Sequence, residues 1–169
     1  DHWELSTTMS RSSNHSYFSR GTPQLKDAFL VSEPFTVPAD GVLRFWHAYQ
    51  LDERGDGAVI EISVDGGATF FDLEPHVFEG SYTEQISSSS RSPIKGRMAW
   101  TGWSLDEMTR VQIDLRSYAG ENAILRFRIA CDRGVTSHGW YIDDVSISGA
   151  EFLELFNSGF ESGSTEDWG

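Results

Sequence analysis

The chain has 169 residues, of which 38% are hydrophobic and 13% aromatic, a composition typical of one folded domain and not of a disordered segment. Its formal net charge of −13, from 26 acidic and 13 basic residues, argues against binding to nucleic acid or to anionic membranes, because both need a basic surface. No stretch approaches the roughly 18 apolar residues of a membrane-spanning helix. The chain begins at Asp1 without an initiator Met or an apolar leader, so we expect a piece of a larger secreted protein.

Alternation of apolar and polar residues predicts strands along most of the chain, because successive side chains of a strand point to opposite faces. In chain order, the predicted strands cover residues 29–31, 35–37, 43–51, 58–65, 70–73, 98–102, 111–115, 125–131 and 140–147. Turn clusters rich in Gly, Asp, Asn and Pro separate many of them, at residues 38–41, 54–57, 65–67 and 119–122. Residues 105–109 are interpreted as one helical turn.

Many short strands with Gly-rich turns and almost no helix predict an all-β fold. We expect a two-sheet antiparallel β-sandwich, of the jelly-roll kind, over residues 1–149. Residues 150–169 are rich in Ser and Gly and are expected to be a C-terminal extension, a linker or the start of a next module. Residues 75–97 are a long connection with four consecutive Ser, a length that usually marks a functional or flexible loop.

Several segments, taken together and in order, carry a family resemblance. They are Leu30-Val31-Ser32-Glu33-Pro34, Leu43-Arg44-Phe45-Trp46-His47, Asp56-Gly57-Ala58-Val59-Ile60-Glu61-Ile62-Ser63-Val64-Asp65-Gly66-Gly67-Ala68-Thr69-Phe70, Trp100-Thr101-Gly102, Val111-Gln112-Ile113-Asp114-Leu115, Leu125-Arg126-Phe127-Arg128 and Gly139-Trp140-Tyr141-Ile142-Asp143-Asp144-Val145. The chain resembles the MAM-like jelly-roll domain of bacterial metalloproteases of the immune inhibitor A type. The resemblance implies a MAM-like or concanavalin-like sandwich that is non-catalytic and extracellular. Its expected partners are the parent catalytic domain or other proteins. A segment that usually opens such domains stands here at the end instead, in Gly159–Gly163 with Trp168.

The resemblance also implies a structural Ca²⁺, held in many jelly rolls by an Asp of a late strand and residues of an early strand. In this chain the ligands would be Asp143 or Asp144 with Asp27. Calcium takes about six to eight oxygen ligands, so backbone carbonyls and water would complete the site. The alternative is that these carboxylates only accept hydrogen bonds, or pair with Arg126 or Arg128.

Two acidic turns have a structural and a functional interpretation. The loop at residues 52–56 is a second candidate for a cation, and its simpler interpretation is an exposed, solvated turn. The pattern Ser63-x-Asp65-x-Gly67-x-Thr69-Phe70 matches the Asp-box of sialidase propellers. Because propellers carry several copies and this chain has one, we interpret it as a hairpin turn. There Asp65 accepts backbone N–H bonds, and Gly66 and Gly67 take positive φ.

No motif in the sequence indicates catalysis. A nucleophile elbow, a P-loop, a dinucleotide fingerprint and an H-E-x-x-H zinc motif are all absent, so we expect neither an enzyme nor a zinc site. Paired carboxylates for glycoside hydrolysis stay open as an alternative, since their spacing is purely spatial. Cys131 alternates with apolar residues and is interpreted as a buried small hydrophobe. His47, among strand aromatics, is expected to be a hydrogen-bonded core or rim residue.

Aromatic side chains near strand ends are the candidate ligand contacts. They are Tyr49, Tyr82, Trp100 and Trp103, with Phe78 nearby. Exposed aromatic rings on a rigid sandwich can stack on sugar rings or anchor a protein partner, and the alternative is that they fill the core. The predicted function is a non-catalytic, protease-associated accessory or interaction domain, and the alternative is a carbohydrate-binding module that takes glycans.

Overall fold

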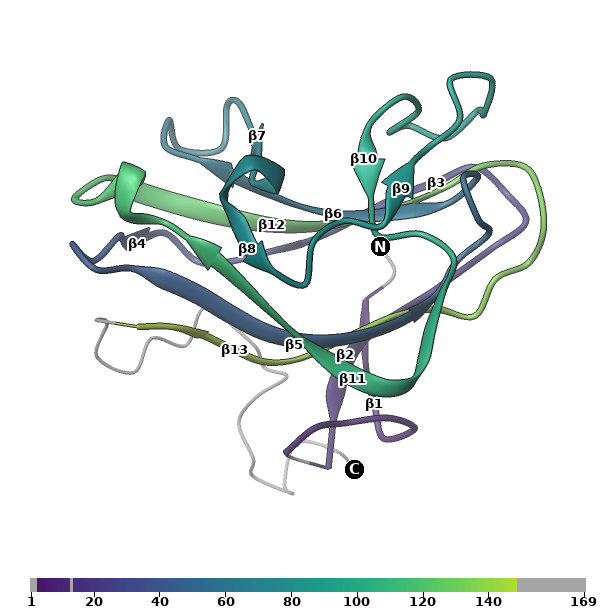
Figure 1. The fold of residues 1–169 in the computed structure, drawn as a ribbon, viewed down its shortest axis with the longest axis horizontal. Helices are drawn as coiled ribbons and strands as arrows, with labels where there is room; N and C mark the ends of the chain where they lie inside the picture. The colour runs from purple at the N-terminus through teal and green to yellow at the C-terminus, as the bar shows by residue number, and fades with distance from the viewer. Residues whose placement is uncertain (1–2, 13, 149–169) are drawn as a thin grey trace.

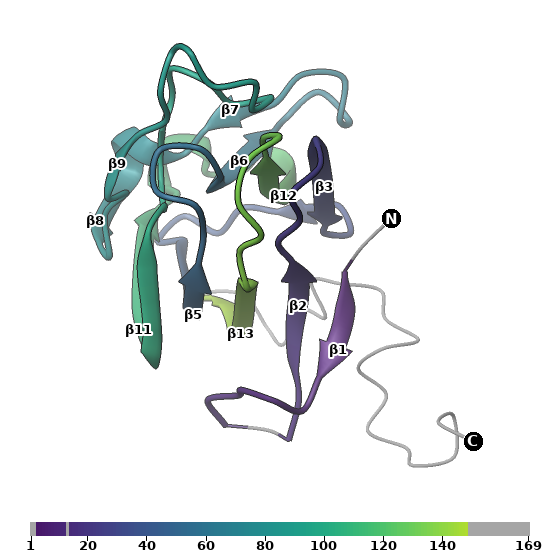
Figure 2. The same cartoon turned by 90° about the vertical axis from the view of Figure 1, so that its right-hand side faces the viewer.

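The computed structural model describes residues 3–12 and 14–148. The chain forms two antiparallel sheets that face each other, one above the other in Figure 1 and end-on in Figure 2. The predicted two-sheet β-sandwich is therefore confirmed. Within the described ranges the helical elements are two short 3-10 turns, Glu74–His76 and Arg116–Tyr118. No helix in this part of the chain has the length and apolar character that crossing a membrane requires.

Six strands form the larger sheet, in the order β1-β2-β13-β5-β11-β8. They are β1 (Glu4–Ser6), β2 (Ser16–Arg20), β13 (Gly139–Ile147), β5 (Val42–Gln50), β11 (Trp103–Asp114) and β8 (Val77–Glu79). The second sheet runs β3 (Lys26–Val31), β12 (Asn122–Cys131), β6 (Gly57–Ser63) and β7 (Phe71–Asp72), and β4 (Phe35–Thr36) also pairs with β12. A separate ribbon joins β9 (Glu84–Gln85) to β10 (Met98–Ala99). The outer strands β1 and β3 lie on the same side of the sandwich (Figure 2).

The core lies between the sheets and is rich in aromatic rings. Phe45 of β5 meets Phe127 of β12 edge-on across the sandwich, with ring centroids 5.1 Å apart. Trp100 and Trp140 are also completely buried in this core. Fully burying a large apolar side chain stabilises a fold by roughly 1.5–3 kcal/mol, so the alternating residues of the long strands dominate its stability.

The helical turn expected at residues 105–109 is wrong, because the segment belongs to β11. The pairing of β11 with β5 shifts register between Ser104 and Thr109, so the strand bulges there. Leu105 and Met108 thereby turn onto the outer face of the larger sheet and pack in a second apolar cluster with Phe18.

Strand β2 was not predicted because both of its faces are covered. Tyr17 packs in the main core and Phe18 in the outer cluster, so apolar residues do not alternate with polar ones. The long connection at residues 75–97 is also more ordered than expected, since it contains a 3-10 turn and the short strands β8 and β9.

Candidate functional site

Most of the aromatic residues expected to meet a ligand lie inside the sandwich. Tyr49, Tyr82 and Trp100 are all buried, and Trp100 is only 1% exposed. The Tyr82 hydroxyl donates to the Asp72 carboxylate at 2.9 Å, so its polar end is also occupied within the protein. The structure corrects the expectation for these three residues, because the core requires their rings. Trp103, at 63% exposed, is the one of the four that lies on the surface.

The expected calcium ligands do not come together. Asp27 lies on β3, where its carboxylate accepts Nε–H and Nη2–H bonds from Arg128 at 2.7 and 2.8 Å. Asp143 and Asp144 lie on β13, in the other sheet. In the ranges that the structure covers, no three His, Cys, Asp or Glu side chains gather where they could hold one metal ion.

Asp143 and Asp144 instead fasten the loop between β1 and β2. The buried Asp143 carboxylate accepts the backbone N–H of Arg11 at 2.6 Å and that of Asp144 at 2.8 Å. Burial raises the pKa of Asp143, and these N–H bonds partly offset the rise. Asp144 has a φ of 50° and accepts a hydrogen bond from the Ser12 hydroxyl. The oxygens therefore face N–H and O–H donors, and calcium at this place stays a prediction from the resemblance.

The acidic loop before β6 is only partly the exposed turn that was expected. Asp56 is 1% exposed and accepts the Asp132 N–H and the Ser137 O–H, both at 2.9 Å. Burial raises the pKa of Asp56 to about 6 in spite of these bonds. The Asp52 and Asp132 carboxylates crowd the position that a Cβ on Gly55 would take, with oxygens at 2.6 and 3.4 Å. This junction ties loops together at one end of the sandwich.

A charged network that no motif indicated covers the outer face of the second sheet. The Glu61 side chain is 3% exposed and pairs with Arg97, Arg126 and Arg128 at 2.7, 2.6 and 3.4 Å. Burial alone would raise the pKa of Glu61, but the hydrogen bonds from Arg97 and Arg126 outweigh it and lower the pKa. The sequence did show Arg126 and Arg128 alternating with core residues. It could not show that their partner lies on another strand.

Two expectations for single residues are confirmed, and both make the residue structural. Cys131 is a buried free thiol, and burial raises its pKa to about 12, so it is not a nucleophile at neutral pH. His47 is buried, its Nδ1 accepts the indole N–H of Trp140 at 3.2 Å, and burial lowers its pKa to about 3. Neither residue contributes to a surface site.

The turn at residues 63–69 is a hairpin, as interpreted. The Asp65 carboxylate accepts the backbone N–H of Thr69 at 2.9 Å and a bond from the Ser63 hydroxyl at 2.7 Å. These hydrogen bonds, led by those from Thr69, lower the pKa of Asp65 to about 2. Gly66 and Gly67 have φ values of 74° and 90°, as the hairpin interpretation required.

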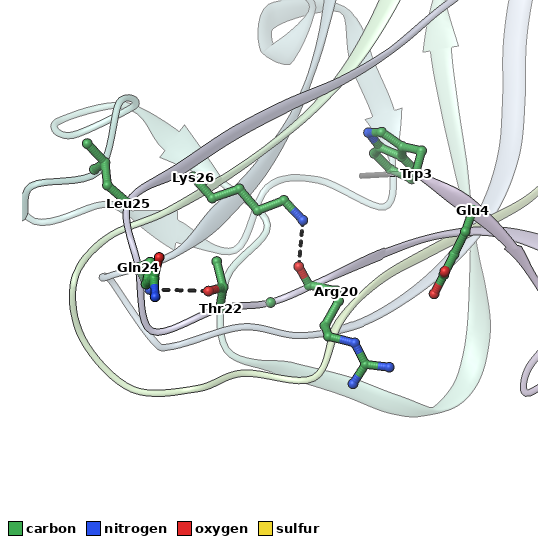
Figure 3. Close-up of a pocket in the computed structure, with 8 residues that line it drawn as sticks. Trp3, Glu4, Arg20, Thr22, Gln24, Leu25 and Lys26 are labelled. Carbon is green, nitrogen blue, oxygen red and sulfur yellow. Dashed lines mark hydrogen bonds between the residues drawn. The ribbon is translucent and has the colours of Figure 1, made fainter. Parts of the chain in front are cut away.

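A hollow of about 530 Å³ lies where the ends of β1, β2 and β3 meet (Figure 3). Trp3, Arg20, Leu25 and Lys26 line it, together with Glu4 and the backbone between β2 and β3. The Trp3 ring packs edge-on against the Trp140 ring, with the two ring centroids 5.6 Å apart. We define these residues as the Trp3 hollow. Sequence reasoning missed it, because its lining comes from short strand ends and a loop without a motif.

Two cationic side chains give the Trp3 hollow its chemistry. The Lys26 ammonium donates to the Ser19 hydroxyl oxygen at 2.9 Å and to the Arg20 carbonyl at 2.6 Å. Burial lowers the pKa of Lys26, the charge of Arg20 lowers it further, and Glu4 opposes the change. An aromatic wall beside cations and hydrogen-bond donors is equipped to hold a polar ligand.

Comparisons with known proteins support the fold. No family model matches the chain. Over 123 residues, or 70% of the chain, it is 28% identical to bacillopeptidase F of Bacillus subtilis (strain 168), of which it spans only 7%. Among solved structures, the K1 cleaved adhesin domain of Lys-gingipain from Porphyromonas gingivalis W83 is similar, with a TM-score of 0.52 and 16% identity over 89% of this chain and 85% of that one. The K3 cleaved adhesin domain of the same protein has a TM-score of 0.50 and 19% identity, covering 82% and 75% of the two chains. The chain is thus an antiparallel β-sandwich similar to these adhesin domains and to a segment of bacillopeptidase F.

Proposed function

We propose that this chain is a non-catalytic, extracellular accessory domain of a larger protease, which binds other molecules for its parent. The observation that carries the proposal is the match of 70% of the chain to 7% of a peptidase, because a short match inside a long chain is the pattern of an appended module. The similarity of fold to the cleaved adhesin domains of Lys-gingipain agrees with this role. The β-sandwich supplies a rigid frame from which loops and strand ends contact partners.

The finer assignment, a MAM-like domain of the immune inhibitor A type, is part of the proposal and rests on the sequence motifs. Structural calcium belongs to the same proposal, supported by the acidic composition and the resemblance. Its partners would be the parent catalytic domain or other extracellular proteins.

The accessory role is tested by assaying the purified chain for turnover and for binding in parallel. We expect no hydrolysis of casein, of chromogenic peptides or of chromogenic glycosides above the buffer blank. We also expect saturable binding to at least one immobilised extracellular polysaccharide or matrix protein. Hydrolysis that scales with chain concentration and survives repurification would overturn the non-catalytic assignment.

Carbohydrate binding is the second candidate function, and the Trp3 hollow favours it. A tryptophan wall next to hydrogen-bonding side chains is the combination that polar rings with one apolar face require. The candidate is tested with neutral and acidic oligosaccharides in solution.

A further inference from the structure

Two basic residues without a carboxylate partner among the described residues, Arg20 and Lys26, line the Trp3 hollow. All 13 basic residues lie in the described part of the chain. Those in ion pairs are Arg54, Arg97, Arg110, Arg116, Arg126 and Arg128. Arg20 and Lys26 make no ion pair with any described residue, yet both line the same hollow. Arg20 has a cation–π contact instead, with its guanidinium carbon 5.8 Å from the centre of the Phe18 ring, so the positive charges of both residues are not neutralised by a paired carboxylate.

The Lys26 ammonium contacts the Arg20 carbonyl, and the Arg20 guanidinium points away from that ammonium (Figure 3). The partial burial of Lys26 disfavours its protonated form, and the positive charge of Arg20 adds to that cost. One carboxylate, that of Glu4, stands at the rim, which leaves a local charge of about +1. The Lys26 ammonium has three donors and uses two of them within the protein. An anionic group in the hollow would accept the third bond and offset the repulsion.

The shape and the remaining lining favour a ring-shaped ligand. Trp3 supplies an aromatic wall and Leu25 an apolar contact, while the Thr22 and Gln24 side chains are polar (Figure 3). The Trp3 indole N–H is buried without an acceptor, and in Figure 3 the nitrogen lies on the side of the ring nearer to Lys26. A volume of about 530 Å³ suits a compact ligand of one or two sugar rings better than an extended peptide.

We infer that the Trp3 hollow binds a sugar residue that carries a carboxylate, with the carboxylate at the Lys26 ammonium and the ring against Trp3. The inference rests on the carbohydrate-binding candidate function and names its ligand class. Uronic acids and sialic acid share the required chemistry.

The test uses acidic oligosaccharides with matched neutral ones. Isothermal titration of the 169-residue chain compares trigalacturonate with galactotriose, and 3′-sialyllactose with lactose. We expect saturable binding of at least one acidic sugar, at least about tenfold weaker binding of its neutral match, and weaker binding as salt increases. A triglutamate peptide serves as the third arm, and we expect no binding of it.

Variants of opposite charge locate the site. Arg20→Gln removes a positive charge that lines the hollow without an ion pair and should weaken acidic-sugar binding about two- to fivefold without unfolding the domain. Glu4→Gln should strengthen it about two- to fivefold, since it removes the one carboxylate at the rim. Arg91→Gln and Glu107→Gln make the same charge changes at exposed positions outside the hollow and should leave the affinity unchanged.

The outcomes separate this inference from the proposed function. Equal binding of acidic and neutral sugars would overturn the carboxylate specificity and leave carbohydrate binding standing. Equal binding of triglutamate would show general attraction to anions and would overturn the sugar assignment. Failure of both acidic sugars to bind would overturn the inference as a whole. The accessory role would be untouched, because the turnover assay decides it separately.

Discussion

Replacing Glu61 with Gln measures how much the buried charged network contributes to stability. The change keeps the shape of the side chain and removes the charge that Arg97, Arg126 and Arg128 share. Because the Glu61 side chain is only 3% exposed, solvent and salt screen these pairs weakly. Removing one partner of a buried ion pair costs about 3–5 kcal/mol.

The other contacts of the three arginines place the expected loss of stability near the low end of this range. Two of the three guanidiniums keep a second carboxylate, from Asp72 and Asp27, whereas Arg126 pairs with Glu61 alone among the described residues. We therefore expect Glu61→Gln to lower the free energy of unfolding by about 3 kcal/mol, near the low end. For a domain of this size, that corresponds to a fall in Tm of about 6–12 °C.

The assay is urea unfolding followed by tryptophan fluorescence, with Asp27→Asn as the matched control. The control removes a carboxylate from the same network, but its side chain is 33% exposed, so we expect a loss of at most about 1 kcal/mol. The reasoning is refuted if Glu61→Gln unfolds within about 0.5 kcal/mol of the parent, or if both variants lose the same stability.

The pH dependence of the same variant gives an independent check. The pKa of Glu61 is lowered from its ordinary value of 4.5, so the folded state holds the charged form more tightly than the unfolded state. Its contribution is therefore present above pH 4.5 and is lost as the pH falls through the folded pKa. The difference between parent and Glu61→Gln should shrink over that window.

Other residues carry further predictions. His47 has a folded pKa of about 3 against an ordinary 6.5, so the unfolded state takes up the proton first, and up to about 5 kcal/mol of stability should be lost between pH 6.5 and 3. Urea unfolding measured across this pH range tests the prediction. It would be contradicted if the free energy of unfolding of His47→Gln fell with pH as steeply as that of the parent. Gly139→Ala should cost more than about 2 kcal/mol, because its φ is 132° and the new Cβ would lie 2.2 Å from the Ser19 carbonyl oxygen. Gly66→Ala, with a φ of 74° and no atom within 4 Å, should cost only about 1 kcal/mol, and equal urea-unfolding losses would exclude the clash as the cause. For calcium, we expect a higher Tm with Ca²⁺ than with chelator and loss of the increase in Asp143→Asn. Identical melts would reject the ion, and an increase that survives the substitution would place it elsewhere.

The strands could be predicted because each depends on the local alternation of apolar and polar residues. Leu125, Phe127 and Ile129 alternate with charged residues, and this period-two pattern places one face of β12 in a core whatever its neighbours are. The hairpin at Gly66 and Gly67 was likewise predictable, since only residues that tolerate positive φ fit there. The two-sheet sandwich follows from many such strands and turns.

The site residues depended on which strands and loops become neighbours, and alternation does not encode that. Trp100 and Trp103 stand three residues apart in the sequence, yet one is buried in the core and the other is exposed. Asp27 and Asp143 were expected together and lie on different sheets. Their separation follows from the strand order, which long-range packing sets.

The sequence by itself determined an antiparallel β-sandwich with a buried Cys131, and it left His47 as a core or rim residue. Backbone geometry requires the alternation of faces, so the pattern can be read one strand at a time. Only the tertiary structure brought Trp3 to Lys26 and enclosed Glu61 among arginines. Both arrangements join residues of different strands, so their interactions stabilise the protein only after the sheets have paired and packed.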